Sequence, residues 1–196
     1  MPAIKTQRNG SKKQVIIGKA ARLFREKGFA ATSMRDLAEE VGVEAASLYN
    51  HIQSKAEILQ DICFRTANLL TSHLEKIEHN QQNAIEKIKA ILRFHIQQML
   101  NNYEEVQVAD REWRHLTEPY LSNFKTQRRA YRQRLANIIE DGIRKRQIKP
   151  IDASTAVLIM LHAVSGIESW HRSLERISAE QLEDNMIVIL VEGLKI

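Results

Sequence analysis

The chain has 196 residues, of which 43% are hydrophobic, so it is long enough to bury a core in one large or two small domains. Its single cysteine, Cys63, excludes an internal disulfide, and we expect a small buried side chain. The net charge of +5 is uneven: residues 1–55 hold ten Lys/Arg and five Asp/Glu, whereas residues 56–196 are neutral. A positive end on a neutral body is typical of a nucleic-acid-binding module, although a solvated basic face has the same composition.

Targeting segments are not expected. The first thirteen residues lack the apolar stretch of a signal peptide. The longest uncharged stretch, residues 153–167, falls short of the ~18 apolar residues that a membrane span needs. We therefore expect a cytoplasmic protein.

An all-α fold is predicted, because apolar residues recur three and four positions apart and alternating strand-like runs are scarce. The first helix is expected over residues 11–27, with Gly28 as its C-terminal stop. The second starts after Ser33, which has the spacing of a capping box with Asp36.

A helix-turn-helix is predicted next. Gly42 ends the second helix, and a third is expected over residues 44–51 after only one further residue. Helices joined by so short a turn cross steeply instead of lying antiparallel.

The remaining helices are expected to form a larger second domain. Ser54 and Glu57 have the spacing of another capping box. The predicted helices cover 54–78, 83–102, 104–116, 118–147, 152–173 and 178–194. The predicted domains are residues 1–55, which bind DNA and include a basic N-terminal arm, and residues 56–196, which bind a ligand and form a dimer.

The third helix has side chains suited to the major groove. Small or hydrogen-bonding residues there allow a close approach to base edges: Ala45, Ala46, Ser47 and Asn50. Residues with the reach to hold phosphates are Tyr49, His51 and Lys55. Val43 and Leu48 are expected to face inward, and the basic arm comprises Lys5, Arg8, Lys12 and Lys13. Taken singly, each of these residues also fits an ordinary helix surface.

Together, "IIGKAARLFREKGFAATSMRDLAEEVGVEAASLYNHIQSKAEIL", residues 16–59, resembles the DNA-binding domain of the TetR (tetracycline repressor) family of bacterial regulators. The resemblance implies that Ser33 and Arg35 contact the DNA backbone or a base, and that the third helix reads the operator. Two positions depart from the family pattern: Glu44 replaces a common serine, and Ile52 a common phenylalanine. Glu44 weakens the helix cap and brings negative charge toward DNA, which Arg35 is placed to neutralise.

The C-terminal segments are expected to form the dimer interface. "DASTAVLIMLHAVSGIESW" is apolar on nearly all sides and must be covered from two directions, and the last helix adds Leu182, Met186, Ile189 and Leu190. Two helices from each of two chains would make the four-helix bundle that the resemblance implies. A monomer that uses these faces internally is the alternative.

A small-molecule effector site is expected between the helices of the larger domain. Its candidate lining residues, which also suit a plain core, are Phe94, His95, Met99, Trp113, His115, Phe124, Met160 and Trp170. "REWRHLTEPYLSNF" and "ESWHR" are similar to TetR-like regulators that sense acyl-CoA thioesters, which implies an acyl-CoA or lipid-like effector. Arginines available to its phosphates are Arg111, Arg114, Arg128, Arg129, Arg132 and Arg172. An effector that favours a tilt of the helix from Ser54 would release DNA.

An alternative from another class of protein, the enzymes, is a ferritin-like di-iron oxidase. Two Glu-x-x-His pairs, Glu112/His115 and Glu168/His171, lie on predicted helices, with Glu86 and Glu140 as further carboxylates. This hypothesis leaves residues 1–55 unexplained. No phosphate-binding loop, nucleophile elbow or His-Glu-x-x-His motif is present, so we expect no enzyme and no cofactor; a protein-binding helical adaptor is the third possibility.

Overall fold

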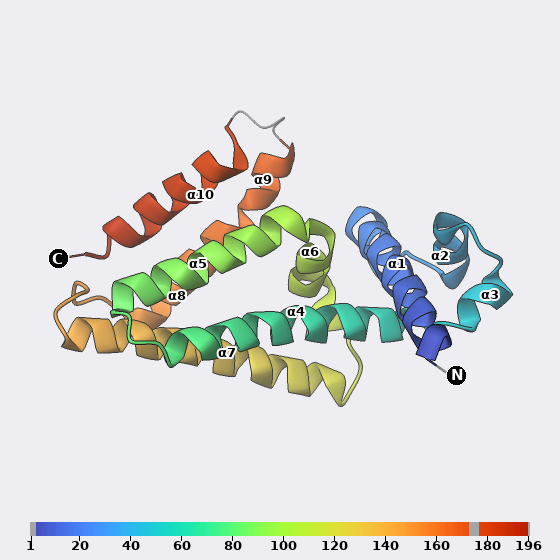
Figure 1. The fold of residues 1–196 in the computed structure, drawn as a ribbon, viewed down its shortest axis with the longest axis horizontal. Coiled ribbons are helices and arrows are strands. Elements are labelled where there is room, and N and C mark those ends of the chain that lie inside the picture. Colours follow the sequence, from blue (N-terminus) through green and yellow to red (C-terminus); the bar gives the residue numbers. More distant parts are fainter. Residues whose placement is uncertain (1–2, 173–176, 196) are drawn as a thin grey trace. The chain divides into compact units, whose positions relative to one another are not determined.

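The computed structural model describes residues 3–172 and 177–195, and this part of the chain is helical and contains no β-strand (Figure 1). The all-α prediction is confirmed. In chain order the elements are α1 (Ala3–Lys27), α2 (Met34–Val41), α3 (Ala45–Tyr49), α4 (Lys55–Glu78), α5 (Ala84–Asn101), α6 (Tyr103–Arg111), the 3-10 turn η1 (Glu112–His115), α7 (Tyr120–Arg144), α8 (Ala153–Ser165), α9 (Ile167–Arg172), α10 (Ala179–Ile187) and the π-helical turn η2 (Val188–Glu192). None of these helices is both long and apolar enough to cross a membrane.

The chain divides into two compact units. Unit 1 comprises Met1–Ala67 and Glu104–Lys125, and unit 2 comprises Asn68–Tyr103 and Thr126–Ile196. The division therefore falls inside α4, whereas the sequence predicts a boundary near residue 55. It also assigns α6 from Glu104 onward and η1 to the unit that contains the helix-turn-helix.

Unit 1 has a continuous apolar core. One face of α1 is buried, and it comprises Ile16, Ile17, Ala20, Leu23 and Phe24, of which Phe24 is 0% exposed. Leu37 of α2, Leu48 of α3 and Ile62 of α4 are buried in the same cluster, as is Cys63. Residues from the second segment complete it: Val108, Ala109, Leu116 and Phe124. Burial of these side chains explains why residues 104–125 belong with α1–α3.

In unit 2, α5 packs against α8, α9 and α10. Gly142, near the end of α7, permits a close approach: a Cβ there would lie 2.5 Å from Ile148 Cδ1 and 2.7 Å from the Ala84 Cβ. Gln147 accepts a hydrogen bond from the Ala84 N–H at 3.0 Å, which fixes the same junction.

Three predicted helices are interrupted. The helix expected over 104–116 ends at Arg111 and tightens into η1. The helix expected over 152–173 breaks at Gly166, whose N–H is shared by the carbonyls of His162 and Ala163. The helix expected over 178–194 passes into η2 at Val188. Changes between hydrogen-bonding patterns of this kind depend on packing and leave little trace in hydrophobic periodicity.

Candidate nucleic-acid interface and effector site

The turn between α2 and α3 is built on a left-handed glycine. Gly42 has φ 78°, and its N–H donates to the carbonyls of Ala38 and Glu39, both at 3.0 Å. Val43 N–H also donates to Ala38, at 3.0 Å, and Glu44 is extended. A non-glycine residue adopts this φ only at a cost, so the glycine allows α3 to begin immediately at an angle to α2.

The α3 helix exposes its small side chains. Ala45, Ala46 and Ser47 are exposed, whereas Leu48 is fully buried and anchors the helix. Tyr49 is 51% exposed and Asn50 is exposed beside it. The four residues proposed to contact bases are therefore all exposed, as is Tyr49, whereas His51 is half-buried.

Two expectations for this turn need correction. Val43 is predicted to face inward, but it is 38% exposed, and Leu48 is the buried residue of α3. Glu44 makes no side-chain cap, as expected, but the ion pairs of the described residues do not join it to Arg35. Arg35 is exposed on α2.

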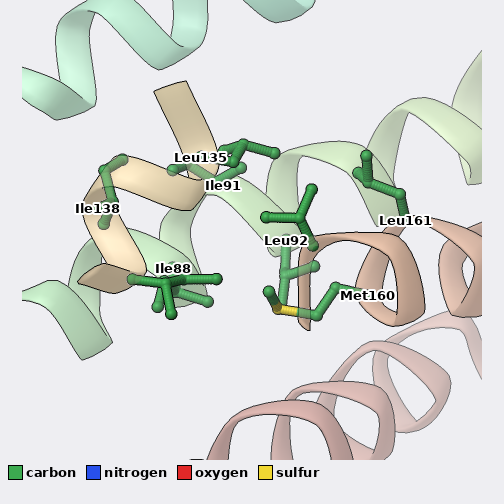
Figure 2. A pocket seen from close by; sticks show the side chains of 9 residues that line it. Ile88, Ile91, Leu92, Leu135, Ile138, Met160 and Leu161 are labelled. Atoms are coloured by element: carbon green, nitrogen blue, oxygen red, sulfur yellow. The ribbon is translucent and has the colours of Figure 1, made fainter. Parts of the chain in front are cut away.

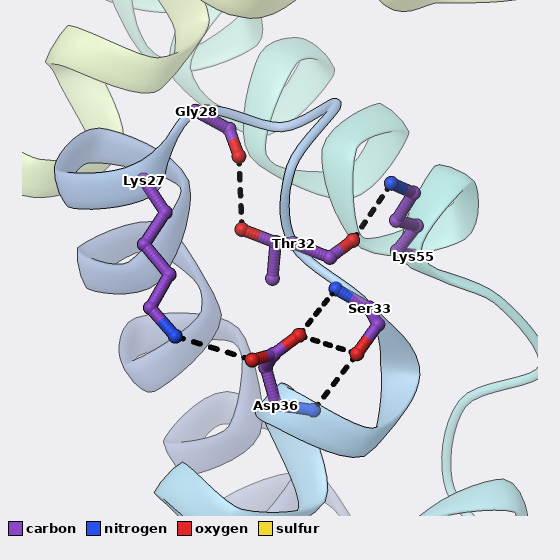
Figure 3. Close-up of polar contacts among 6 residues, drawn as sticks. All are labelled: Lys27, Gly28, Thr32, Ser33, Asp36 and Lys55. Carbon is purple, nitrogen blue, oxygen red and sulfur yellow. Dashed lines mark hydrogen bonds and ion pairs between the residues drawn. The ribbon is translucent and has the colours of Figure 1, made fainter.

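The start of α2 is held by a full capping box (Figure 3). Asp36 N–H donates to Ser33 Oγ at 3.1 Å, and Ser33 N–H donates to the Asp36 carboxylate at 2.8 Å, as predicted. Lys27 from the end of α1 pairs with the same carboxylate at 3.1 Å. Hydrogen bonds from Ser33, with help from Lys27, hold the pKa of Asp36 well below its usual range. The box therefore orients α2, and Ser33 Oγ already has partners within the protein.

Lys55 holds the connection between α1 and α2 (Figure 3). Its ammonium donates to the carbonyls of Phe29 at 2.8 Å, Ala30 at 3.2 Å and Thr32 at 2.7 Å, and lies 4.6 Å from the centre of the Phe29 ring. Thr32 Oγ1 in turn donates to the Gly28 carbonyl at 2.9 Å. An ammonium has three donors, so Lys55, expected to hold a DNA phosphate, is fully engaged within unit 1.

The start of α4 is capped differently from the prediction. Glu57 N–H donates to Ser54 Oγ at 3.2 Å, but the Glu57 carboxylate accepts from Gln53 N–H at 2.9 Å instead of closing the box on Ser54. Lys13 binds the same carboxylate at 3.0 Å. The Gln53 N–H, followed by Lys13, lowers the pKa of Glu57.

The basic arm is helical where it is described, since α1 begins at Ala3. Lys13 is bound to Glu57 and, at 3.8 Å, to Asp61, so it is a tie between α1 and α4. Lys12 is exposed. The side chains of Lys5 and Arg8 lie outside the described part of the structure.

Three of the predicted effector residues belong to unit 1. His115 stacks on Phe29 with 5.4 Å between ring centres, and Glu112 accepts the Phe29 N–H at 3.3 Å. Trp113 packs on the buried Phe124 at 6.1 Å. Phe124 and Trp113 join the core that contains the helix-turn-helix, whereas His115 is exposed.

The other five belong to unit 2 and separate into three groups. Met160 lines a small apolar hollow (Figure 2). Phe94 and His95 lie in an aromatic and histidine cluster. Met99 is linked to α9 through its carbonyl, which lies 3.0 Å from His171 Nε2, while Trp170 donates to the Ile177 carbonyl at 3.1 Å. Of the predicted effector residues, Met160 lines the hollow, and the other four of unit 2 lie outside its lining.

The hollow lies among α5, α7 and α8 and has a volume of about 20 Å³. Its lining is wholly apolar: Ile88, Ile91, Leu92, Leu135, Ile138, Ile139, Val157, Met160 and Leu161 (Figure 2). Space for about one water without polar partners stays dry. The lining residues come from three helices that are far apart in the sequence, so only tertiary packing decides where a gap remains.

Next along α5, His95 Nε2 lies 2.7 Å from the hydroxyl of Tyr131, on α7. Burial lowers the pKa of His95 to about 4, and the same cause raises that of Tyr131. His73, on α4, stacks on Phe94 with 3.9 Å between ring centres, and burial lowers its pKa as well. The sequence analysis missed His73 and Tyr131, whose roles depend on contacts between helices.

The arginines considered for a phosphate are spread over several elements. Arg114 lies 4.7 Å from the centre of the Trp113 ring. Arg129 and Arg132 are exposed on α7, and both Arg111 and Arg128 interact within the protein. The side chain of Arg172 lies outside the described residues.

The di-iron alternative is not supported. Within residues 3–172 and 177–195, no three His, Cys, Asp or Glu side chains gather as metal ligands would. Glu112 and His115 contact each other at 3.5 Å and both engage Phe29. His171 Nε2 lies 3.0 Å from the Met99 carbonyl oxygen.

Comparison with known proteins gives matches at both ends of the chain. The family model described as "Bacterial regulatory proteins, tetR family" matches residues 16–62, and "Tetracyclin repressor-like, C-terminal domain" matches residues 81–194.

Individual relatives span nearly the whole chain. The HTH-type transcriptional repressor KstR2 of Mycolicibacterium smegmatis is 20% identical over 186 residues, which cover 94% of this chain and 91% of that protein. The structure of the ketosteroid transcriptional regulator KstR2 of Mycobacterium tuberculosis superposes with a TM-score of 0.85 at 21% identity, covering 96% of this chain and 95% of the other. AibR in complex with isovaleryl coenzyme A and operator DNA superposes with a TM-score of 0.80 at 25% identity, covering 92% and 98%.

Proposed function

Because the chain belongs to the TetR family of bacterial regulatory proteins, we propose that it is a homodimeric transcriptional repressor that leaves its DNA operator when a small effector binds unit 2. The observation that carries the proposal is the exposure of Ala45, Ala46 and Ser47 on α3, which begins three residues after the left-handed Gly42. A helix enters the major groove closely only where its side chains are small.

We assign contacts with the DNA bases to α3, and contacts with the DNA backbone to residues at the end of α3 and in α2. Alanine methyl groups at 45 and 46 suit thymine methyls, Ser47 donates or accepts, and Asn50 pairs with adenine. Contacts to DNA phosphates are assigned to Tyr49 and His51, together with Ser33, the N-cap residue of α2, and Arg35 on α2. For Lys55 the bonds to three carbonyls favour an indirect role, in which it holds the α1–α2 connection that sets the position of α2.

We assign the dimer interface to α8 and to the C-terminal turn η2. Leu158 and Ile159 of α8 are 54% and 56% exposed, and Val188 and Ile189 of η2 are 57% and 73% exposed. Large apolar side chains so exposed in one unit are typical of a protein-protein interface. Covering them with the same faces of a second copy gives a two-fold interface, and two DNA-binding units then meet successive half-sites.

The effector is assigned to the acyl-CoA or lipid-like class. AibR is described with isovaleryl coenzyme A and KstR2 as a ketosteroid regulator, and the apolar hollow of unit 2 suits a hydrophobic group. Because α4 contributes residues to both units, an effector that shifts α4 in unit 2 acts on the unit that holds α3. Each tenfold release of DNA needs about 1.4 kcal/mol of differential binding.

The test is operator binding by a matched pair of variants. Ala46→Glu places a carboxylate on the proposed DNA face, and Ala130→Glu makes the same change at an exposed position of α7. Fluorescence anisotropy with DNA from upstream of the protein's own gene should show at least a hundredfold loss for Ala46→Glu, because a buried charge faces phosphates and bases. Ala130→Glu should bind as the parent does. Equal binding of DNA by both variants would mean that α3 does not contact DNA.

A further inference from the structure

The carboxylate of Glu44, at the start of α3, has no partner among the described residues. Glu44 is the N-cap residue of α3, but its side chain does not cap the helix. The residue is exposed, and no hydrogen bond or ion pair within residues 3–172 and 177–195 involves its carboxylate. Its backbone is fixed, because the Glu44 carbonyl accepts the N–H groups of Ser47 at 2.9 Å and Leu48 at 3.1 Å. The side chain therefore starts from a fixed point next to Ala45 and is available to a partner outside the protein.

Two other acidic side chains of unit 1 have structural roles. The Asp36 carboxylate closes the capping box of α2 and pairs with Lys27 at 3.1 Å (Figure 3). The Glu57 carboxylate binds Lys13 at 3.0 Å, which ties α4 to α1. Glu44 has neither kind of contact with the described residues, although serine, threonine, aspartate and asparagine are the side chains that cap a helix well. A residue that breaks a local rule without a compensating contact points to a functional role.

The positive charge of the first 55 residues does not lie on the helix-turn-helix itself. Residues 1–33, which contain α1, hold eight Lys/Arg and one Asp/Glu, whereas residues 34–52, which contain α2 and α3, hold one Lys/Arg and four Asp/Glu. Attraction to phosphates is therefore assigned to α1, and it does not depend on the base sequence. A carboxylate on the helix that meets the bases lowers the affinity for DNA wherever it gains no hydrogen bond from a base.

The major groove offers a carboxylate one well-suited base. Cytosine presents its N4 amine, which donates a hydrogen bond, and no acceptor. Adenine also presents an amine, at N6, but its N7 acceptor lies beside that amine and repels a carboxylate. Guanine presents only acceptors, and thymine presents O4 and a methyl group. A carboxylate on α3 would therefore be attracted by cytosine and repelled by the other bases, and both effects contribute to specificity.

We propose that Glu44 selects a cytosine in each half-site of the operator by accepting a hydrogen bond from its N4 amine, and that it rejects thymine at the same position. The small side chains of Ala45 and Ala46 let α3 approach the bases, and the longer Glu44 side chain then reaches a neighbouring base pair. The inference rests on the proposed function, since it requires α3 to lie in the major groove.

Binding-site selection by the full-length protein tests the proposal. The probe is a library of DNA duplexes with a randomised central segment, and the enriched duplex is then compared by fluorescence anisotropy with one that carries thymine in place of the selected cytosine in each half-site. We expect the parent to bind the cytosine duplex about tenfold more tightly than the thymine duplex, as is typical of one correct base contact. Glu44→Ala should bind the two duplexes within about threefold of each other, because both the attraction and the repulsion are removed.

A matched pair of variants separates base selection from a general effect of charge. Glu44→Gln should enrich adenine instead of cytosine, because a side-chain amide both accepts from N6 and donates to N7. Glu39→Gln removes the same charge at an exposed position of α2 and should still enrich cytosine. A loss of folding cannot produce a change of the selected base. Enrichment of the same bases by the parent and by both Glu44 variants would overturn the inference.

The same selection distinguishes this inference from the proposed function. A parent that enriches one duplex, in which no selected base depends on residue 44, remains a sequence-specific DNA-binding protein but loses the assigned role of Glu44. A parent that enriches no duplex at all would contradict both the operator binding and the selection of cytosine.

Discussion

At the scale of single residues, buried groups are kept in one protonation state by their surroundings. His95 is the clearest case, because burial depresses its pKa to about 4 and the Tyr131 hydroxyl occupies its Nε2. His73 from α4 adds to the depression of the His95 pKa, and Arg134, which is bound by Glu78, acts on Tyr131. A neutral imidazole in the folded protein makes stability depend on pH.

We expect the free energy of unfolding to fall as the pH is lowered from about 6.5 to 4. The unfolded chain binds a proton at His95 below pH ~6.5, whereas the folded protein does so only near pH 4, so acid favours unfolding in this window. The shift corresponds to a loss of up to about 3 kcal/mol, at ~1.4 kcal/mol per pKa unit. Urea unfolding followed by circular dichroism at several pH values measures it.

The matched variant is His95→Gln, which keeps a polar side chain but does not titrate. It should lose most of the dependence between pH 6.5 and 4 and retain the smaller part that the lowered pKa of His73 contributes. An unchanged pH profile in this variant would assign the dependence to other groups.

At the scale of secondary-structure elements, the distance between packed helices decides whether a glycine can be replaced by a larger residue. Gly28 and Gly42 have positive φ and open space around them, so their constraint is the backbone alone. Gly142 is different, because a Cβ there would overlap Ile148 and Ala84. The end of α7, the start of α5 and the segment after α7 meet at this point.

Gly142→Ala should therefore destabilise the protein by about 1–3 kcal/mol, the usual range for overpacking, although alanine favours a helix. Gly18→Ala is the control, because Gly18 lies within α1 and a Cβ there has nothing within 4 Å. Thermal unfolding should show a lower midpoint for Gly142→Ala and an unchanged or higher one for Gly18→Ala. Equal midpoints would mean that Ile148 moves away without cost.

At the scale of the whole molecule, the exposed apolar faces of unit 2 predict self-association. We expect Ile159→Glu to convert the proposed homodimer to a monomer, since the new charge would be buried against the same face of the second copy. Sedimentation velocity at micromolar concentration measures the mass, and operator affinity should fall with it because one half-site binds alone.

The control for this prediction is Val15→Glu. Val15 is 57% exposed and Ile159 is 56% exposed, but Val15 lies on α1 in unit 1. The Val15 variant should remain dimeric. A dimeric Ile159→Glu protein would place the interface elsewhere.

The sequence by itself determined the helical elements, the glycine turn at Gly42, the capping box of Ser33 and Asp36, and the family to which the chain belongs. These features depend on residues close together in the chain, whose propensities and spacing are visible in one dimension. The tertiary structure alone decided that Lys55 binds three carbonyls, that residues 104–125 join unit 1, and that His95 of α5 meets Tyr131 of α7. Such features depend on which side chains distant in sequence meet when helices pack, and no local pattern encodes that choice.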